Sequence, residues 1–431
     1  MKRFNRFILD EAAQQKLTFN RGHAYEFVLA AAMVARFTDR WDDGTPRELD
    51  ASSVEEVMAG YFMRKGEKEV WTVSAGDGVE DTVEFDGSGL PTDVLAALGE
   101  PTIRKDNPDV KKMVTTAIKA VAKNKTLENL STRVIKNGIE DTVKVVCGGT
   151  TGQMSTKSDI DLFVNEKVPK VDALKGIKNV DLRDAGFSVK WGGVEQVGQW
   201  SGVNLDDNII KAFTSFGMKI TSGDVMGVAV ASGPTSGFVG TGYKGRKDSQ
   251  VEKDKNIMFN AVRLSFGKIS TKNQPVEFRK LVNVNNLIKG IKESISGAPK
   301  PKTGKPAEQD IELIRNASSL NRDSYIALGK GLLASAADPK SNLRWVLGTR
   351  GNPTMQLHVT VDNETKILFQ IRCRYDADPI DKKKTKYKAR FRILAELGTD
   401  IWDFIAHHQQ GMGRSRSSRV RQAPQPRRRR R

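Results

Sequence analysis

Apolar positions at helical spacing predict a buried helix near the start of the 431-residue chain. Over residues 21–37, Tyr25, Val28, Leu29 and Ala32 recur on one helical face, and most positions between them are also apolar. Since such a helix has no polar side to turn to water, we expect it to lie in the core.

Further along, proline and turn residues mark two more helices. One begins at Asn107-Pro108-Asp109, because proline is favoured in the first helical turn, and a second covers Leu127 to Lys136. Helical spacing also predicts helices over Val194–Trp200, Asn208–Phe216 and residues 308–336.

Short runs rich in β-branched residues predict strands. The runs are EVWTV (69–73), TVEF (82–85), TVKVVC (142–147), SDIDLFVN (158–165), AGFSVK (185–190), MQLHVTV, ILFQIRCRY and KYKARFRIL. A glycine-rich stretch over residues 226–247 indicates a strand followed by a mobile loop. The elements together predict an α/β (α+β) protein with a mixed sheet flanked by helices.

The last two predicted strands alternate between apolar and basic residues. Side chains two apart share one face of a strand, so Phe369, Ile371, Cys373 and Tyr375 oppose a basic face. We expect that face to contact phosphates through Arg372, Arg374, Lys386, Lys388, Arg390 and Arg392.

Charge is distributed unevenly over a chain whose formal net charge is +18. Residues 39–99 hold 15 acidic and 5 basic residues, whereas residues 413–431 hold nine arginines and no acid. The arginine-rich tail is expected to be disordered and, through residues such as Arg427, Arg428 and Arg429, to bind DNA.

Composition shifts suggest a series of segments. We expect residues 1–38 to contain the first core helix, 39–100 an acidic insertion or small lobe, and 101–296 the enzymatic core. A Pro/Lys-rich linker or loop at 297–307 then precedes a basic, β-rich region over 308–412 and the tail at 413–431.

Two cysteines and four histidines exclude a disulfide scaffold and a Cys/His zinc site, so a metal would need oxygen ligands. The sequence has no run of about 20 apolar residues and no apolar secretion signal, so we expect a cytoplasmic protein without membrane contact. If the source is viral, the host cytoplasm or the virion would be its location.

Two aspartates at a strand edge are the main candidates for metal binding. Asp159 and Asp161 are two apart, so their carboxylates share one face, and Ser188 and Lys190 share a face of the next strand. A divalent cation beside a lysine suits phosphodiester hydrolysis, because the metal neutralises the phosphate and the amine orients or deprotonates water.

The order of these residues resembles that of the PD-(D/E)xK nuclease superfamily, the restriction-endonuclease-like fold. In that family an early helix often supplies a glutamate, here Glu26 after Gly22, and a strand supplies an aspartate, here Asp159 with Asp161 in reserve. The next strand supplies (D/E)xK, to which Ser188-Val189-Lys190 corresponds in part. The resemblance covers residues 20–205 and favours a phage or restriction-type member.

Serine at position 188 departs from that pattern, because it cannot replace an acidic metal ligand. Some relatives recover the acid from the next helix, so Glu195, with Gln196 as a second candidate, is expected to complete the site. The resemblance implies Mg²⁺ (or Mn²⁺) held by Asp159, Asp161, Glu26 and Glu195, and catalysis by Lys190, Asp159, Glu26, Ser188 and Gln196.

The implied activity is that of a Mg²⁺-dependent deoxyribonuclease, an endonuclease acting on DNA. The resemblance does not fix the oligomeric state, and a homodimer is one option. A nucleotidyltransferase is an alternative, because Gly148-Gly149 followed by Asp159 and Asp161 has the spacing of that signature and Asp181 could add a third carboxylate. A second alternative is a DNA-binding or packaging protein with a degenerate nuclease fold.

Overall fold

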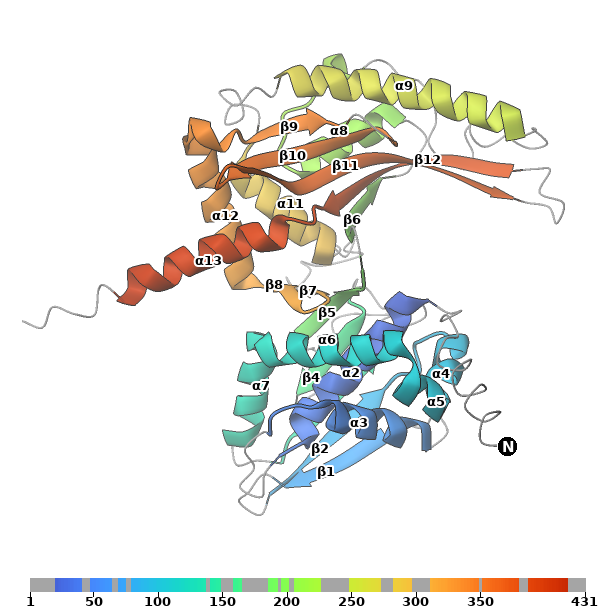
Figure 1. The fold of residues 1–431 in the computed structure, drawn as a ribbon, viewed down its shortest axis with the longest axis vertical. Coiled ribbons are helices and arrows are strands. Elements are labelled where there is room, and N and C mark those ends of the chain that lie inside the picture. The colour runs from blue at the N-terminus through green and yellow to red at the C-terminus, as the bar shows by residue number, and fades with distance from the viewer. Residues whose placement is uncertain are drawn as a thin grey trace, which may run out of the picture. The chain divides into compact units, whose positions relative to one another are not determined.

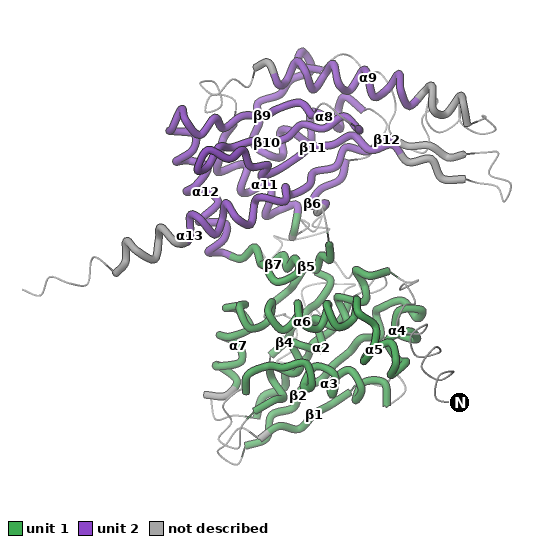
Figure 2. The backbone as a smooth tube through the Cα atoms, in the orientation of Figure 1, with its two compact units in different colours: residues 1–192, 295–321 green, residues 193–294, 322–431 purple. Residues whose placement is uncertain are grey.

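The computed structural model describes residues 20–417 apart from thirteen internal gaps, at 41–46, 64–68, 75–78, 137–139, 149–157, 165–184, 193–194, 201–204, 226–247, 273–281, 297–310, 349–350 and 380–386. The side chains of some residues beside these gaps are also left undescribed. The chain forms two compact units, residues 1–192 with 295–321, and residues 193–294 with 322–431 (Figure 2). The described residues form eleven α-helices and two sheets, as expected for an α/β (α+β) protein.

Unit 1 contains a mixed seven-stranded sheet. Its strands, in spatial order, are β1 (Glu69–Ser74), β2 (Glu80–Asp86), β3 (Thr142–Cys147), β4 (Ile160–Val164), β5 (Ala185–Lys190), β7 (Ile311–Arg315) and β8 (Ser318–Leu320) (Figure 1). β2 pairs with β3 in parallel and β5 with β7 in parallel, whereas the other neighbours are antiparallel.

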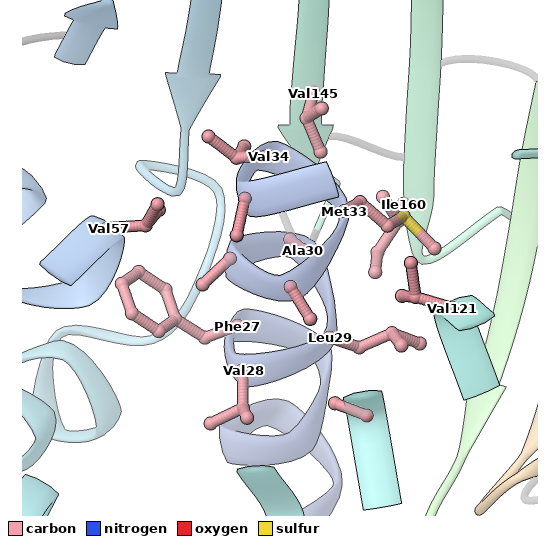
Figure 3. Close-up of a cluster of buried hydrophobic side chains, with 14 of the residues drawn as sticks. Phe27, Val28, Leu29, Ala30, Met33, Val34, Val57, Val121, Val145 and Ile160 are labelled. Atoms are coloured by element: carbon pink, nitrogen blue, oxygen red, sulfur yellow. The ribbon is translucent and has the colours of Figure 1, made fainter. Parts of the chain in front are cut away.

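The predicted first helix is α2 (Arg21–Thr38), and it is the central element of the core of unit 1. The Asn20 side chain caps it by accepting a hydrogen bond from the Gly22 amide at 2.8 Å. Its apolar residues contact strands as well as helices, as Figure 3 shows for α2 residues near Val145 of β3 and Val57 of α3 (Ala51–Met63). A helix covered on all sides has to be apolar all round, which explains its composition.

The other helices of unit 1 are α4 (Thr92–Gly99), α5 (Pro101–Asp106), α6 (Pro108–Lys123) and α7 (Lys125–Lys136). The Asn107 side chain caps α6 by accepting from the amides of Asp109 and Val110, at 2.9 and 3.4 Å. The helices expected at Asn107 and at Leu127–Lys136 are therefore confirmed.

The acidic segment 39–100 contributes to the same unit. Its strands β1 and β2 extend the sheet beyond β3, and its residues Val57, Val83 and Phe85 belong to the core around α2. Within this segment Arg40 and Asp81 form a buried ion pair, in which Arg40 Nη1 lies 2.7 Å from Asp81 Oδ2.

Unit 2 contains an antiparallel five-stranded sheet. Its order is β6 (Glu195–Trp200), β12 (Tyr387–Leu397), β11 (Glu364–Pro379), β10 (Thr354–Val361) and β9 (Arg344–Leu347). Its helices are α8 (Leu205–Ser215), α9 (Asp248–Lys272), α11 (Val284–Ser296), α12 (Arg322–Ala337) and α13 (Ile401–Ser417), with short 3-10 turns η1 (Ser222–Asp224) and η3 (Pro339–Ser341).

Two helix predictions were wrong. Residues 194–200 were expected to be helical, but Glu195–Trp200 is strand β6, in which Val197 and Gly198 are buried beside β12. Residues 308–321 were expected to begin a helix, but Ile311–Arg315 and Ser318–Leu320 are strands. These strands are only three to six residues long, so pairing with distant strands decided their conformation.

The division into units also differs from the expected segments. The 101–296 core is divided after Gly192, because the next strand, β6, pairs with β12 of unit 2. Residues 295–321 return to unit 1, because β7 pairs with β5 although more than 100 residues separate them. The expected linker at 297–307 and the glycine-rich stretch 226–247 lie outside the described residues. Helix α13 extends to Ser417, five residues into the tail expected to be disordered. Among the described residues, no helix is long and apolar enough to span a membrane.

Candidate active site

Polar side chains from several elements of unit 1 meet at one edge of its sheet. Asp159 comes directly before β4 and Lys190 ends β5, and because these strands are antiparallel the two residues are neighbours. A hydrogen bond of 2.8 Å from the Asp159 amide to the Phe187 carbonyl fixes the junction. The ladder thus brings together two residues that are 31 positions apart.

The Asp159 carboxylate is held mainly through one oxygen. Asp159 Oδ2 accepts from the Val189 amide at 2.6 Å and from Ser188 Oγ at 3.2 Å, and Lys190 Nζ lies 3.2 Å away. These contacts fix the position of the carboxylate. Ser188 is 5% exposed and acts as a donor to the aspartate, so in this structure it orients an acid and does not substitute for one.

Glu26 lies in the first half of α2 and is buried, with 6% of its surface exposed. Burial raises the pKa of its carboxyl to about 8, the negative charge of Asp159 adds to the rise, and the positive charge of Lys190 opposes it. Electrostatic coupling of this kind requires proximity. The structure therefore places Glu26 near Asp159 and Lys190, and Ser188 beside Asp159.

Asp161 occupies a different position from Asp159. Its Oδ1 accepts a hydrogen bond of 2.5 Å from Ser158 Oγ, and its charge is not among those that shift the pKa of Glu26. Of the two aspartates, Asp159 is therefore the one coupled to both Glu26 and Lys190.

Glu195 and Gln196 do not lie on a helix after the lysine. Both are in strand β6 of unit 2, where Glu195 pairs with Leu397 and Gln196 with Glu396. The Gln196 amide donates to Gln199 Oε1 at 3.1 Å, a contact within the five-stranded sheet. The lost acid of the (D/E)xK pattern is thus not restored by a helix at this position.

Sequence reasoning missed Asp86, which ends strand β2 at the same sheet edge. The Ser88 amide and hydroxyl donate to Asp86 Oδ1 at 3.0 and 2.6 Å. Burial first, and then the charges of Glu26, Asp86 and Asp159, raise the pKa of the Cys147 thiol. Asp86 pairs with Val146 of β3, and the Asp159 carbonyl accepts a hydrogen bond from the Gly148 amide, so both acids lie at the end of β3. The parallel pairing of β2 with β3 was the signal that could have revealed Asp86.

A second group missed by the sequence ties α2 to the end of β5. The Tyr25 hydroxyl donates to the Asn316 carbonyl at 2.6 Å, and the Gly192 amide donates to Asn316 Oδ1 at 3.3 Å. The Tyr25 and Trp191 rings are 4.7 Å apart between centroids. Tyr25 is next to Glu26 and Trp191 is next to Lys190, so these contacts fix the position of α2 relative to the end of β5.

The donor set fits a small, hard cation. Mg²⁺ is commonly bound through one or two carboxylates, with water and substrate phosphates filling the remaining positions. Glu26 and Asp159 supply two such carboxylates, although within the described part of the chain no three His, Cys, Asp or Glu side chains form a complete metal cluster. A metal here would share its coordination with the substrate.

The residues expected to bind DNA lie on the polar face of the sheet in unit 2. On the opposite face Phe369, Ile371 and Cys373 are buried, as predicted. Arg372 forms an ion pair with the buried Glu396, and Arg392 Nη1 donates to Gln199 Oε1 at 3.1 Å. Arg374 is exposed. Lys388 and Arg390 lie in β12, but their side chains, like Lys386 and the tail arginines 427–429, are outside the described set.

Comparison with known proteins gives no identification: no family model matches the chain, and neither does any curated protein or solved structure.

Proposed function

We propose that this protein is a metal-dependent DNA nuclease that hydrolyses phosphodiester bonds at the edge of the unit 1 sheet. The observation that carries the proposal is the grouping of a fixed aspartate, a lysine 3.2 Å from it and a buried glutamate coupled to both. Carboxylates that hold a cation beside a lysine are suited to attack on phosphate.

Four side chains and one backbone amide have distinct tasks in this proposal. Asp159 and Glu26 hold Mg²⁺ or Mn²⁺, which when bound neutralises the scissile phosphate and activates water. Ser188 and the Val189 amide keep Asp159 oriented. Lys190, whose side chain is 36% exposed, orients the attacking water towards phosphorus. As the new P–O bond forms, the water gives up a proton to solvent, the bond to the leaving oxygen breaks, and that oxygen takes a proton from solvent.

The order of elements supports a restriction-endonuclease-like fold for unit 1. Helix α2 supplies Glu26, the start of β4 supplies Asp159, and β5 supplies Ser188-Val189-Lys190, all on a mixed sheet covered by helices. A DNA-cleaving enzyme of this kind would act in the cytoplasm.

Nucleotidyl transfer is the second candidate, because the Gly148 amide donates to the Asp159 carbonyl at 2.9 Å and so places a glycine beside the aspartate. Its other signature residues, Gly149 and Asp181, lie outside the described residues. Transfer would leave Glu26 and Lys190 without a role, which favours hydrolysis.

The test is degradation of supercoiled plasmid in Mg²⁺ by wild type, Asp159→Asn and Lys190→Ala. Matched controls are Asp93→Asn and Lys119→Ala, which alter exposed helix positions of unit 1. We expect the two site variants to lose cleavage and the controls to keep it. Incorporation of labelled nucleotide in place of cleavage would favour the transferase, and DNA binding without either reaction would favour a binding or packaging protein.

A further inference from the structure

The charge of the protein is concentrated in one of its two units. Unit 2 contains 38 lysines and arginines against 19 aspartates and glutamates, whereas unit 1 contains 32 against 33. Without the nine arginines of residues 413–431, unit 2 still has 29 basic residues against 19 acidic ones. The candidate active site is therefore in a nearly neutral unit, and attraction for a polyanion resides in the other.

Within unit 2, strands β11 and β12 continue past their neighbours as a two-stranded ribbon. Pairing of β10 with β11 ends at Arg372, and pairing of β6 with β12 ends at Ile393. Pairing between β11 and β12 continues for a further seven residues on β11, to Pro379 opposite Tyr387. A two-stranded ribbon has the dimensions that the major groove of B-DNA admits.

One face at the root of this ribbon is closed by packing. Phe391 is fully buried, and its ring centroid lies 4.9 Å from that of Tyr375 and 6.2 Å from that of Phe259 in α9. The opposite face carries the polar side chains, so only that face can receive a ligand.

The open face combines positive charge with amide groups. Arg374 and Arg392 are directly opposite each other in the antiparallel ladder, beside the register pair of Asp376 and Arg390. Next to them, the exposed Gln196 and Gln199 on β6 are hydrogen bonded to each other, and Gln199 accepts from Arg392. Arginine and glutamine are the side chains that pair with guanine and adenine edges in the major groove.

We propose that the root of the β11–β12 ribbon binds duplex DNA through the major groove, with Arg374 and Arg392 as its central contacts and Gln196 and Gln199 beside them. This inference rests on the proposed action on DNA but concerns binding alone. It assigns recognition to unit 2 and hydrolysis to unit 1.

The test uses the full-length protein in EDTA, so that cleavage is absent, and a 30-base-pair duplex. Affinity is measured over a salt series for wild type, Arg374→Ala/Arg392→Ala and the matched control Lys211→Ala/Lys340→Ala, which removes two exposed charges elsewhere in unit 2. We expect the ribbon variant to bind about tenfold more weakly, with a salt slope flatter by about 1.8, whereas the control changes little.

Major-groove contact is tested separately by protection of guanine N7 from dimethyl sulfate, because N7 faces that groove. Wild type should protect guanines, and the double alanine variant should not. Arg374→Lys/Arg392→Lys, which keeps the charge, should retain the salt slope but lose guanine protection, and thermal unfolding identifies any variant that fails to fold.

The outcomes separate the two proposals. Unchanged affinity and protection in the ribbon variant would refute the ribbon assignment, as would tighter binding of single-stranded RNA or of an acidic peptide than of the duplex. Guanine protection by wild type without cleavage in Mg²⁺ or Mn²⁺ would refute the nuclease and leave the ribbon assignment standing.

Discussion

Lys190 Nζ lies 3.2 Å from Asp159 Oδ2, and the two residues come from adjacent antiparallel strands. The same carboxylate oxygen accepts a hydrogen bond from the Val189 amide, so the aspartate is fixed by the backbone of the strand that carries the lysine. A change in the position of β5 would therefore move both groups together. This linkage gives the site a defined geometry before substrate binds.

Asp159→Asn should separate binding from cleavage. The substitution removes a metal ligand and a negative charge, so cleavage in Mg²⁺ should fall by about 100-fold or more, while affinity for DNA in EDTA stays equal or rises. Plasmid cleavage and duplex binding are measured on the same preparation. Cleavage equal to that of wild type would exclude Asp159 as a ligand.

Ser188→Ala should have a smaller effect than Asp159→Asn. The hydroxyl contributes one of three contacts to the charged Asp159 Oδ2, and a hydrogen bond to a charged group contributes about 1.5 kcal/mol or more, so cleavage should fall by about tenfold. Single-turnover cleavage rates give the comparison. A loss as large as that of Asp159→Asn would show that Ser188 contacts metal or substrate directly.

The raised pKa of Glu26 predicts a pH-dependent cost to stability. In the unfolded chain this carboxyl ionises near its ordinary pKa of 4.5, whereas in the folded protein it holds its proton to about pH 8. The folded state thus binds more protons between these values, and stability falls as pH rises through that window, by on the order of 5 kcal/mol in total.

Glu26→Gln removes this titration. We therefore expect the difference between the melting temperatures of Glu26→Gln and wild type, measured in EDTA, to increase in favour of the variant from pH 5 to pH 8. The control Glu128→Gln, at an exposed site, should show the same pH dependence as wild type. Adding Mg²⁺ at pH 8 should stabilise wild type more than Glu26→Gln, because the cation favours the ionised carboxylate. A constant difference across pH would contradict the burial-driven shift.

Local patterns in the sequence predicted much of unit 1. The apolar run of α2 and the β-branched runs of β3, β4 and β5 lie where the spacing placed them, and the Asp159–Lys190 pair follows from the alternation of two neighbouring strands. These features depend on contacts that are close in sequence or on one strand pair.

The missed features depend on pairings between distant segments. Strand β7 was taken for helix because its partner β5 lies more than 100 residues earlier, and β6 because its partner β12 lies almost 200 residues later. Asp86 and Asn316 reach the site only through such pairings, of β2 with β3 and of β5 with β7. No periodicity within a short window carries that information.

Asn316 should affect both stability and cleavage. It has a positive φ of 48° and accepts a hydrogen bond from Gly192, two residues after the lysine. Asn316→Ala should be less stable than Asn316→Gly by about 1 kcal/mol, because glycine adopts that φ without strain. Urea unfolding measures the difference.

Both Asn316 variants should also cleave more slowly, since each loses the side-chain contact to Gly192. Asn342 provides the matched control, because it has a φ of 46° in unit 2. Asn342→Ala and Asn342→Gly should differ in stability in the same way while leaving cleavage unchanged. Full cleavage by both Asn316 variants would show that the contact does not position Lys190.

Deleting residues 418–431 should weaken DNA binding without removing catalysis. The deletion ends the chain after helix α13 and removes seven arginines and no acid. Each phosphate contact contributes a slope of about −0.9 to log K against log salt, so loss of four contacts would flatten the slope by about 3.6. Cleavage at low salt should persist because Asp159, Lys190 and Glu26 are untouched.

The affinity of the full-length and truncated proteins is measured over a salt series on two unrelated duplexes. Guanine protection by the ribbon should survive truncation. An unchanged salt slope would show that the tail does not contact DNA and would favour a protein ligand for the tail.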